Sequence, residues 1–364
     1  MDILTKLKDW ITVPRLGSLT AAPKSHDSQD TEDDGVTFPS DHMTPEEMER
    51  HCQQQLKSLP PLLTRQLVEY PPPAEQCLTG NIRIMQWNLL SQALGVHNDN
   101  FTQCPACDLD WGNRRYRILE EIAHYSPDII GLQEVDHFKF LQRGLGTMGY
   151  EGTFFPKPSS PCLSIKSNNG PDGCALFYRT DRFELLQTVT KVIDVWKVQS
   201  NQVAVLCLLR ERRSGRELCV TTTHLKARPG ALNSAVRLEQ GRDLMAFVAP
   251  LAAGRPVLLC GDFNAEPTEP VYGAVTGAGR LPLVSAYRQA AGAEPRYTTW
   301  KIRATGEVCH TLDYVFISVG RFAVTALLPA PTGEALGPRR APSLTYPSDH
   351  FSLVVDLRLL AEPA

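Results

Sequence analysis

The sequence predicts an α/β fold in which two mostly antiparallel sheets pack face to face and helices cover their outer surfaces. Short apolar runs rich in Val, Ile and Leu recur along the chain, which is typical of buried strands. Three such runs, at 174–178, 203–209 and 218–222, follow one another with little helix between them, and this favours antiparallel pairing. Helical spacing of apolar residues at 113–125 and 236–247 predicts helices that flank the sheets.

Residues 81–360 are predicted to form one large domain. The chain has 364 residues, and α/β folds often reach about 250 residues or more as a single unit. Polar motifs extend from Asn88 to His350 without a low-complexity break, so dividing the chain would divide them. The formal net charge of −3 and the pI near 6.3 argue against a general nucleic-acid-binding protein, which is normally strongly basic.

The first eighty residues differ in composition from the rest. Residues 1–43 are predicted to be disordered or weakly ordered, because they are rich in acidic residues, Ser, Thr and Pro. Residues 44–80 are predicted to be a helical lead-in and a linker, since the string at 44–47 matches a helix start with a capping box and the helix can continue to Leu63. We expect removal of residues 1–60 to leave stability and activity nearly unchanged.

The sequence shows no secretory signal and no apolar run of membrane-spanning length. Asp2 and Asp9 weaken the interpretation of the N-terminus as a mitochondrial transit peptide. A cytoplasmic location is therefore expected, with the mitochondrion as the alternative, and the protein is expected to be a monomer.

The ten cysteines are expected to be reduced thiols. Those expected as small core residues on strands are Cys174, Cys207, Cys219 and Cys260. Cys104 and Cys107 form half of a zinc or redox motif, but no second pair follows at a suitable spacing. A solvent-exposed loop is the preferred interpretation of that pair.

Several apolar runs end on an acid, an amide or a histidine. These runs are residues 82–88, 129–134, 220–224, 257–264 and 347–350. A polar residue that ends a buried strand lies where the sheet opens to solvent, so these ends are expected to converge. Glu134, Asp262 and Asp349 would then repel one another unless a divalent cation neutralised them. Oxygen ligands suit Mg²⁺, so the sequence predicts a Mg²⁺ site, with Mn²⁺ as the alternative ion. A single motif of this kind is more often a turn, but five turns by coincidence are implausible.

In this order, the motifs resemble those of the exonuclease-endonuclease-phosphatase superfamily. The strings that carry the resemblance are Gln86–Asn88, Leu132–His137, Thr223–Arg228, Gly261–Pro267 and His310–Tyr314. The resemblance covers roughly residues 81–358 and implies a four-layer α/β sandwich that carries a Mg²⁺-dependent phosphoester hydrolase.

The resemblance also implies a role for each polar residue. Glu134 would bind the metal directly, with Asn88 and Asp349 close to it. His350 would act on the attacking water, and Asp313 would orient its ring. The positions that would hold the phosphoryl group, the water or the leaving oxygen are His224, Asp262 and Asn264.

Further strings resemble one branch of the superfamily, whose members remove the 2′-phosphate of NADP⁺ and NADPH to give NAD⁺ and NADH. These strings are Tyr150–Lys157, Asn168–Cys174 and Tyr297–Arg303, and the implied substrate-binding residues are Lys157, Lys226, Arg228 and Asn169. Outside such a site, Lys and Arg are usually solvated surface residues. Two alternatives stay open, namely a 3′–5′ poly(A)-specific exoribonuclease acting on RNA and a non-catalytic binding protein on the same fold. The mildly acidic charge disfavours the first, and the complete polar set disfavours the second.

Overall fold

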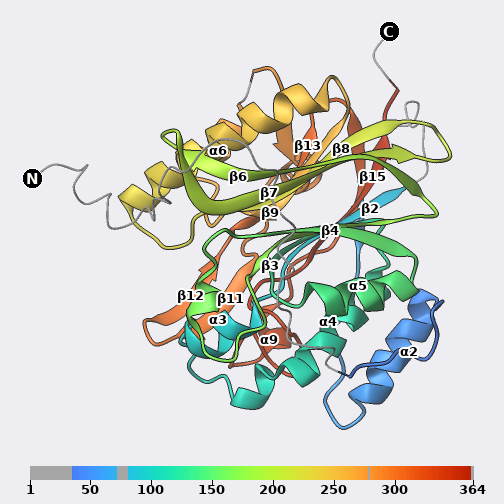
Figure 1. Ribbon diagram of the computed structural model, residues 1–364, viewed down its shortest axis with the longest axis vertical. Coiled ribbons are helices and arrows are strands. Elements are labelled where there is room, and N and C mark those ends of the chain that lie inside the picture. The colour runs from blue at the N-terminus through green and yellow to red at the C-terminus, as the bar shows by residue number, and fades with distance from the viewer. Residues whose placement is uncertain (1–34, 72–80, 278, 362–364) are drawn as a thin grey trace, which may run out of the picture.

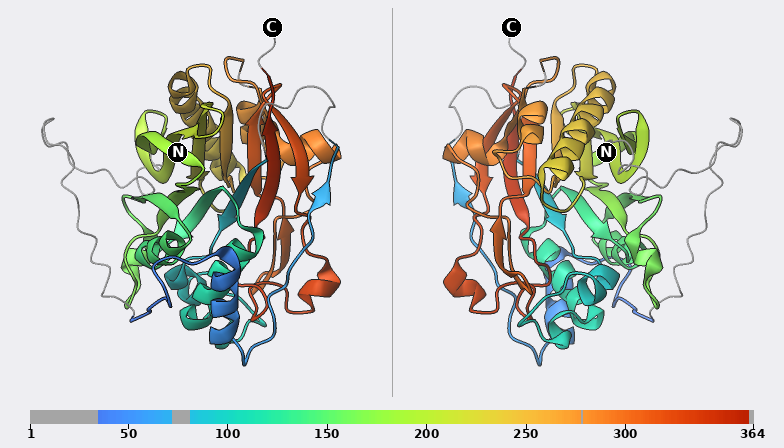
Figure 2. Two further views of the ribbon diagram at one scale, coloured as in Figure 1. Left: turned by 90° about the vertical axis from the view of Figure 1, so that its right-hand side faces the viewer. Right: turned by 90° about the vertical axis from the view of Figure 1, so that its left-hand side faces the viewer.

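A computed structural model describes residues 35–71, 81–277 and 279–361. Two sheets pack face to face, and helices cover both outer faces, so the protein is a four-layer α/β sandwich as predicted (Figure 1, Figure 2). The seven-stranded sheet has the order β1 (Val68–Glu69), β14 (Phe322–Leu327), β15 (Leu353–Leu359), β2 (Ile82–Asn88), β3 (Ile129–Val135), β5 (Gly173–Arg179) and β4 (Tyr150–Pro156). The six-stranded sheet has the order β10 (Leu283–Ser285), β13 (Asp313–Ser318), β9 (Val257–Asp262), β8 (Glu217–His224), β7 (Val198–Glu211) and β6 (Phe183–Val195).

The helices lie outside the sheets or in the connections between strands. Those over the seven-stranded sheet are α2 (Pro45–Gln55), α4 (Trp111–Tyr125) and α5 (Phe138–Thr147), and α6 (Ala231–Ala252) lies over the other sheet (Figure 1). The shorter helices are α3 (Gln92–His97), α7 (Pro270–Thr276), α8 (Ala286–Ala291) and α9 (Gly333–Leu336), with single 3₁₀ turns at η1 (Ala106–Asp108) and η2 (Pro161–Ser164). A separate hairpin consists of β11 (Thr299–Arg303) and β12 (Gly306–His310).

Three clusters of buried apolar side chains hold the layers together. The clusters lie between the helices α2, α4, α5 and the first sheet, between the two sheets, and between the second sheet and α6. Because side chains alternate along a strand, Ile84 faces the second sheet whereas Met85 faces the helices. The sheets approach closely near the site, since a Cβ on Gly131 would lie 2.4 Å from the sulfur of Cys260. A larger residue at 131 would therefore push the sheets apart.

Most strand pairs are antiparallel, as expected, but β2 pairs with β3 and β8 with β9 in parallel. The expected pairing of the runs 203–209 and 218–222 is confirmed by β7 and β8. The run 174–178 is also antiparallel to its neighbours, as expected, but β5 pairs with β3 and β4 of the other sheet and not with β7. The unassigned strand β6 takes its place beside β7. The chain thus changes sheets between β5 and β6.

The predicted helices are present with different bounds. α4 begins two residues earlier than expected, because the carboxylate of Asp110 accepts a hydrogen bond from the Gly112 amide and caps it. α2 has the predicted capping box, in which Thr44 and Glu47 each accept a bond from the other's backbone amide. The helix ends at Gln55, so its expected continuation to Leu63 is wrong.

Residues 43–60 are part of the folded domain. Met48 and Cys52 of α2 are fully buried in the cluster that covers the first sheet, and Met43 and Leu56 belong to the same cluster. The expectation that residues 1–60 are dispensable is therefore wrong for this part of the segment. Residues 1–34 lie outside the described residues. Among the residues that are described, none of the helices combines the length and the apolar character that crossing a membrane requires.

The described cysteines are unpaired thiols. Cys174, Cys207, Cys219 and Cys260 are buried on strands, as predicted. Cys107 is exposed and Cys104 is half-buried beside η1, in agreement with the loop interpretation.

Candidate active site

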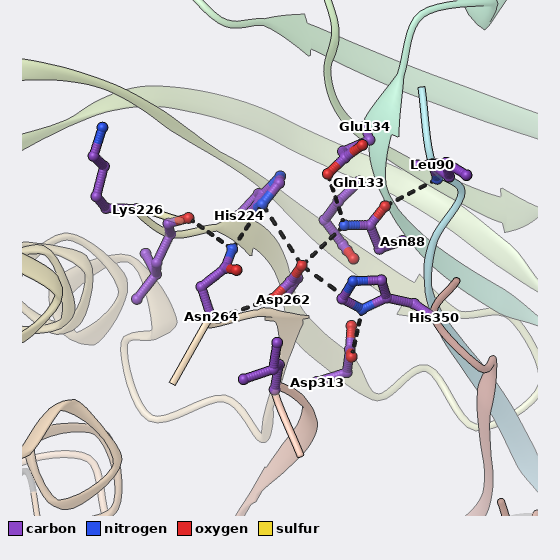
Figure 3. Close-up of polar contacts among 12 residues, drawn as sticks. Asn88, Leu90, Gln133, Glu134, His224, Lys226, Asp262, Asn264, Asp313 and His350 are labelled. Atoms are coloured by element: carbon purple, nitrogen blue, oxygen red, sulfur yellow. Dashed lines mark hydrogen bonds and ion pairs between the residues drawn. The ribbon is translucent and has the colours of Figure 1, made fainter. Parts of the chain in front are cut away.

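The predicted strand ends meet at one edge of the sandwich (Figure 3). Asn88, His224 and Asp262 are the last residues of β2, β8 and β9, and Glu134 is the last but one of β3. Parallel pairing places the ends of β2 and β3 side by side in one sheet, and those of β8 and β9 side by side in the other. Asp313 begins β13 and lies directly opposite Asp262 in the antiparallel register. The site therefore takes residues from both sheets.

Asn88 connects two acids that come from different sheets. Its Nδ2 donates to Oε1 of Glu134 at 3.2 Å and to Oδ2 of Asp262 at 2.9 Å, while its Oδ1 accepts from the Leu90 amide at 3.0 Å. The other oxygen of Glu134 accepts from the Ser91 amide at 3.1 Å. Glu134 has φ 54° at a point where the β3–β5 register shifts, so a local irregularity aims this carboxylate into the site.

His350 is oriented by Asp313, as the sequence predicts. Its Nδ1 donates to Oδ2 of Asp313 at 2.8 Å, and Thr298 Oγ1 donates to the same oxygen at 2.6 Å. The second oxygen of Asp313 accepts from Gln86 at 3.2 Å. Burial lowers the pKa of His350, but Asp313, Asp262 and Asp349 outweigh burial and raise it to about 9. The Nδ1–H of the ring is thus held towards Asp313.

His224 is held as a neutral ring. Burial, Lys157 and His350 lower its pKa well below the usual value. Asn264 Nδ2 donates to the Leu225 carbonyl at 3.1 Å and lies 2.9 Å from Nε2 of His224, and Lys157 Nζ lies 3.5 Å from Nδ1 of the same ring. The neutral ring carries one hydrogen, on one of its two nitrogens. Donation of that hydrogen to a phosphate oxygen stays a prediction.

Asp349 has a partner that the sequence analysis did not identify. Lys301 of β11 forms a buried ion pair with the Asp349 carboxylate. Burial alone would raise the pKa of Asp349, but Lys301, His350 and Arg303 hold it below the usual range. Lys301 neutralises the Asp349 carboxylate. In the part of the chain that the structure describes, the carboxylates of Glu134 and Asp262 have no such ion pair with a lysine, so their charge is more available to a cation. A role of Asp349 near the metal stays a prediction.

The donor set fits a divalent cation. One side-chain atom from each of Asp262, Asp313 and His350 lies within 4.8 Å of the others, and the Asn88 amide joins Asp262 to Glu134. Burial and the neighbouring Asp313 raise the pKa of Asp262, which means that its negative charge is unfavourable without a compensating cation. Carboxylate oxygens in this number suit a hard divalent ion.

Lys157 reaches the site through a buried ion pair. Its Nζ lies 2.6 Å from Oδ2 of Asp172 and 3.5 Å from Nδ1 of His224, and its side chain is 7% exposed. Burial lowers the pKa of Lys157, but Asp172 outweighs burial and holds it above the usual value. Asp172 also accepts bonds from Ser160 and Cys162. The ammonium is therefore fixed by a carboxylate rather than by the prolines that flank it.

Lys226 and Arg228 lie on the loop between β8 and α6. The buried guanidinium of Arg237 donates to the carbonyl of Lys226 at 3.0 Å and to that of Arg228 at 2.9 Å, and a salt bridge to Glu269 holds Arg237 in turn. Burial, Arg228 and Lys157 together lower the pKa of Lys226. Three cations thus gather on one side of the site, and their mutual repulsion would be relieved by an anion.

Asn169 lies in the loop that precedes β5 and is bonded to the segment after β3. Its Nδ2 donates to the Asp136 carbonyl at 2.7 Å, two residues after Glu134. Its predicted substrate contact stays a prediction. Asp172 and Lys301 were not identified from the sequence, although Asp172 lies in the string 168–174 and Lys301 in the string 297–303. A single sequence does not show which carboxylate will pair with which ammonium.

The sequence matches the Endonuclease/Exonuclease/phosphatase family over residues 85–350, a span that includes every side chain of the site. The chain belongs to this family. Phosphoester hydrolases of the endonuclease/exonuclease/phosphatase family generally depend on a divalent metal, in agreement with the acidic cluster. Membership of the family also accounts for the four-layer fold.

Relatives within the family are closely similar. Nocturnin from Xenopus laevis is 45% identical over 331 residues, which cover 89% of this chain and 84% of the relative. Nocturnin from Drosophila melanogaster is 48% identical over 391 residues, covering 95% of this chain but only 60% of the relative. The chain therefore spans well under two thirds of the length of the Drosophila protein.

Solved structures of the family agree with the fold. The human Nocturnin catalytic domain with a bound sulfate anion superposes with a TM-score of 0.68 at 42% identity, covering 82% of this chain and 99% of that domain. ANGEL2, a 2′,3′-cyclic phosphatase, gives a TM-score of 0.66 at 23% identity, covering 81% of this chain and 99% of ANGEL2, and this shows a shared fold alone.

Proposed function

We propose that this protein is a divalent-metal-dependent phosphatase that removes the 2′-phosphate of NADP⁺ and NADPH, with Mg²⁺ as the metal. The observation that carries the proposal is the presence, side by side, of two groups of side chains that are each suited to a phosphate group. One is the group of acids, amides and histidines around Asp262, and the other is the group of cations formed by Lys157, Lys226 and Arg228. NADP(H) offers a phosphate monoester and a diphosphate on the same ribose. A substrate with two phosphate groups matches a site with two such groups of side chains.

The cations support recognition of a second phosphate group. Lys157 is buried and stays charged because of Asp172, whereas Lys226 and Arg228 sit on a loop that Arg237 holds by its carbonyls. Fixed cations lose little conformational entropy when an anion binds. A phosphate bound among them would relieve the repulsion that lowers the pKa of Lys226.

The residues of the site suggest how the phosphoester bond is broken. A divalent cation held by Glu134 and Asp262 would neutralise the acids and polarise a phosphate oxygen. His350 takes a proton from the attacking water at Nε2, and Asp313 stabilises the resulting charge on the ring. His224 donates the one hydrogen of its neutral ring to a phosphate oxygen. The water oxygen bonds to phosphorus as the bond to the ribose 2′-oxygen breaks, and that oxygen receives a proton.

His350 constrains the order of these events. Without a nearby cation its pKa of about 9 keeps the ring protonated at neutral pH, and a protonated ring cannot accept a proton from water. Positive charge near Asp262 and Asp313 would lower this pKa. The proposed base is therefore competent only when positive charge occupies the acidic cluster.

The experiment that tests the proposal compares substrates. The purified protein is incubated in Mg²⁺ with NADPH, NADP⁺ and oligoadenylate, and the release of inorganic phosphate and AMP is measured. We expect phosphate and NADH from NADPH, with little AMP from oligoadenylate. Ready shortening of oligoadenylate with NADPH left intact would overturn the proposal in favour of a poly(A) exoribonuclease. The absence of either product would favour a binding protein.

A further inference from the structure

A cavity of about 220 Å³ opens beside the proposed catalytic centre. Its walls are helix α3, His137 at the start of α5, and the loop 165–169. This volume is smaller than the ~300–1,000 Å³ typical of pockets for a whole drug-sized ligand, so it suits a single ring or ring system. We refer to it as the α3 pocket.

The walls of the α3 pocket are continuous with the residues of the catalytic centre. Ser91, which immediately precedes α3, donates its amide hydrogen to Glu134 at 3.1 Å. The amide of Asn169 donates to the carbonyl of Asp136 at 2.7 Å, and this bond joins the loop to the segment after β3. The same loop continues to Asp172, which fixes Lys157. A ligand at the centre therefore has the α3 pocket within reach.

His137 presents a fixed hydrogen-bond acceptor to the α3 pocket. Its Nδ1 lies 2.8 Å from Oδ1 of the buried Asp136, and its ring stacks on Trp111 with centroids 3.8 Å apart. Because a carboxylate oxygen accepts hydrogen bonds, Nδ1 carries a hydrogen, and in the neutral tautomer this leaves Nε2 as an acceptor. The ring cannot turn without losing both contacts.

Gln92 presents a hydrogen-bond donor to the same pocket. Its Oε1 accepts from the guanidinium of the buried Arg114 at 2.9 Å, and this contact fixes which end of the amide is oxygen. The NH₂ group is the remaining polar end. The other lining residues are the apolar Ala93, Val96 and Ile165 and the polar His97, Ser167, Asn168 and Asn169. The donor on Gln92 and the acceptor on His137 together suit a flat heterocycle that carries an amino group next to a ring nitrogen.

The other large groups of a dinucleotide are directed elsewhere. In a ribose 2′-phosphate the base leaves from C1′ and the diphosphate arm from C4′ and C5′, so the two extend away from each other. The walls of the α3 pocket come from connections of the first sheet, whereas Lys226 and Arg228 follow β8 of the second sheet. Figure 3 shows Lys226 and Glu134 on opposite sides of Asp262.

We propose that the α3 pocket binds the adenine ring of the nucleotide whose 2′-phosphate lies at the catalytic centre. The exocyclic amine of adenine donates to Nε2 of His137, and the amide of Gln92 donates to the neighbouring ring nitrogen. The diphosphate extends towards Lys226 and Arg228. This inference rests on the proposed function for the position of the phosphate, and it assigns the base a site of its own.

The test measures binding rather than turnover, by calorimetry in EDTA. The ligands are adenosine 2′-monophosphate and the purine riboside 2′-monophosphate, which lacks only the exocyclic amine. We expect the parent to prefer the adenosine ligand by about three- to tenfold, the range expected for one hydrogen bond. His137→Phe keeps a ring against Trp111 but removes the acceptor, so it should bind both ligands equally.

A second variant fills the cavity and keeps the inference testable if His137→Phe does not fold. Val96 is 46% exposed and lines the α3 pocket, so Val96→Trp should block it and weaken adenosine 2′-monophosphate binding at least tenfold. Leu163 is 53% exposed on η2 and outside the lining, so Leu163→Trp is the matched control and should bind as the parent does.

Equal affinity of the parent for the two ligands, or parent-like binding by Val96→Trp, would overturn the assignment of the α3 pocket to adenine. These outcomes are separate from failure of the proposed function, which would appear as NADPH left intact by the parent. A preference for adenine that depends on His137, found together with intact NADPH, would support the pocket and reject the phosphatase.

Discussion

Replacing Asp172 with Asn removes the charge that fixes Lys157 beside the catalytic centre. The carboxylate is fully buried, the ammonium is 7% exposed, and the two atoms lie 2.6 Å apart. Breaking a buried ion pair by removing one charge costs about 3–5 kcal/mol. Part of this cost is recovered, because the amide oxygen of the new Asn can still accept a hydrogen bond from Lys157 and because Lys157 can lose its proton. We expect a net loss of about 2–3 kcal/mol, or roughly 3–5 °C in Tm for a domain of this size.

The same substitution should change the pH dependence of activity. In the parent, Asp172 holds the pKa of Lys157 above its usual value, so the stabilisation is present below the usual lysine pKa and is lost only as pH rises through the higher one. In Asp172→Asn the largest opposition to burial is lost and Glu134 is the main one left, so the pKa of Lys157 falls below that of the parent. NADPH hydrolysis, measured as kcat/KM, should fall at least tenfold near pH 7 and further towards pH 9, where the parent keeps its charge.

A matched control separates the effect of losing the buried ion pair at Asp172 from the effect of losing an ion pair in general. Asp181 pairs with Arg179 at 2.8 Å, but its side chain is 60% exposed, so Asp181→Asn should change stability by less than about 1 kcal/mol and leave the pH profile unchanged. The reasoning is refuted if Asp172→Asn matches the parent in Tm and in pH profile. A lower Tm with an unchanged pH profile would limit Asp172 to a structural role.

Three further predictions follow from the site and the fold. Glu134→Ala should abolish turnover without unfolding the protein, and EDTA should abolish turnover of the parent; near-normal rates in saturating Mg²⁺ would contradict the metal assignment. Arg228→Ala should lower kcat/KM for NADPH by about ten- to a hundredfold, because a charge-assisted bond to phosphate contributes about 1.5–3 kcal/mol, whereas Arg213→Ala at an exposed turn should be neutral. Deleting residues 1–34 should leave Tm unchanged, but deleting residues 1–60 should prevent folding, since it removes four buried side chains worth about 1.5–3 kcal/mol each; a Tm equal to that of the parent for the longer deletion would contradict this.

Local signals in the sequence predicted part of this structure correctly. The capping box at Thr44 and Glu47 marks the start of α2, because its hydrogen bonds join residues three apart. Asn88 and Asp262 could be placed at strand ends because each ends an apolar run in the sequence. Such features depend on neighbours in the chain, so a single sequence contains the information.

Features that depend on distant partners were not predictable. Lys157 and Asp172 are 15 residues apart and Lys301 and Asp349 are 48 apart, and many other acids lie at comparable separations. β6 was missed because its side chains are mostly half-buried or exposed, so it lacks an apolar run. The burial of α2 was not predicted because the helix has few apolar residues. These residues become buried, and so stabilise the fold, only when they pack against α4.

We propose that water attacks the 2′-phosphate of NADP(H) at the centre formed by Glu134, Asp262 and His350. Phosphorus NMR of NADPH incubated with the protein and Mg²⁺ tests this proposal, because the monoester and the diphosphate give separate resonances. We expect the monoester resonance to be replaced by that of inorganic phosphate while the diphosphate resonances persist, and we expect Glu134→Ala to leave the spectrum unchanged. Cleavage of the diphosphate, or an unchanged spectrum under conditions in which the protein shortens oligoadenylate, would contradict it.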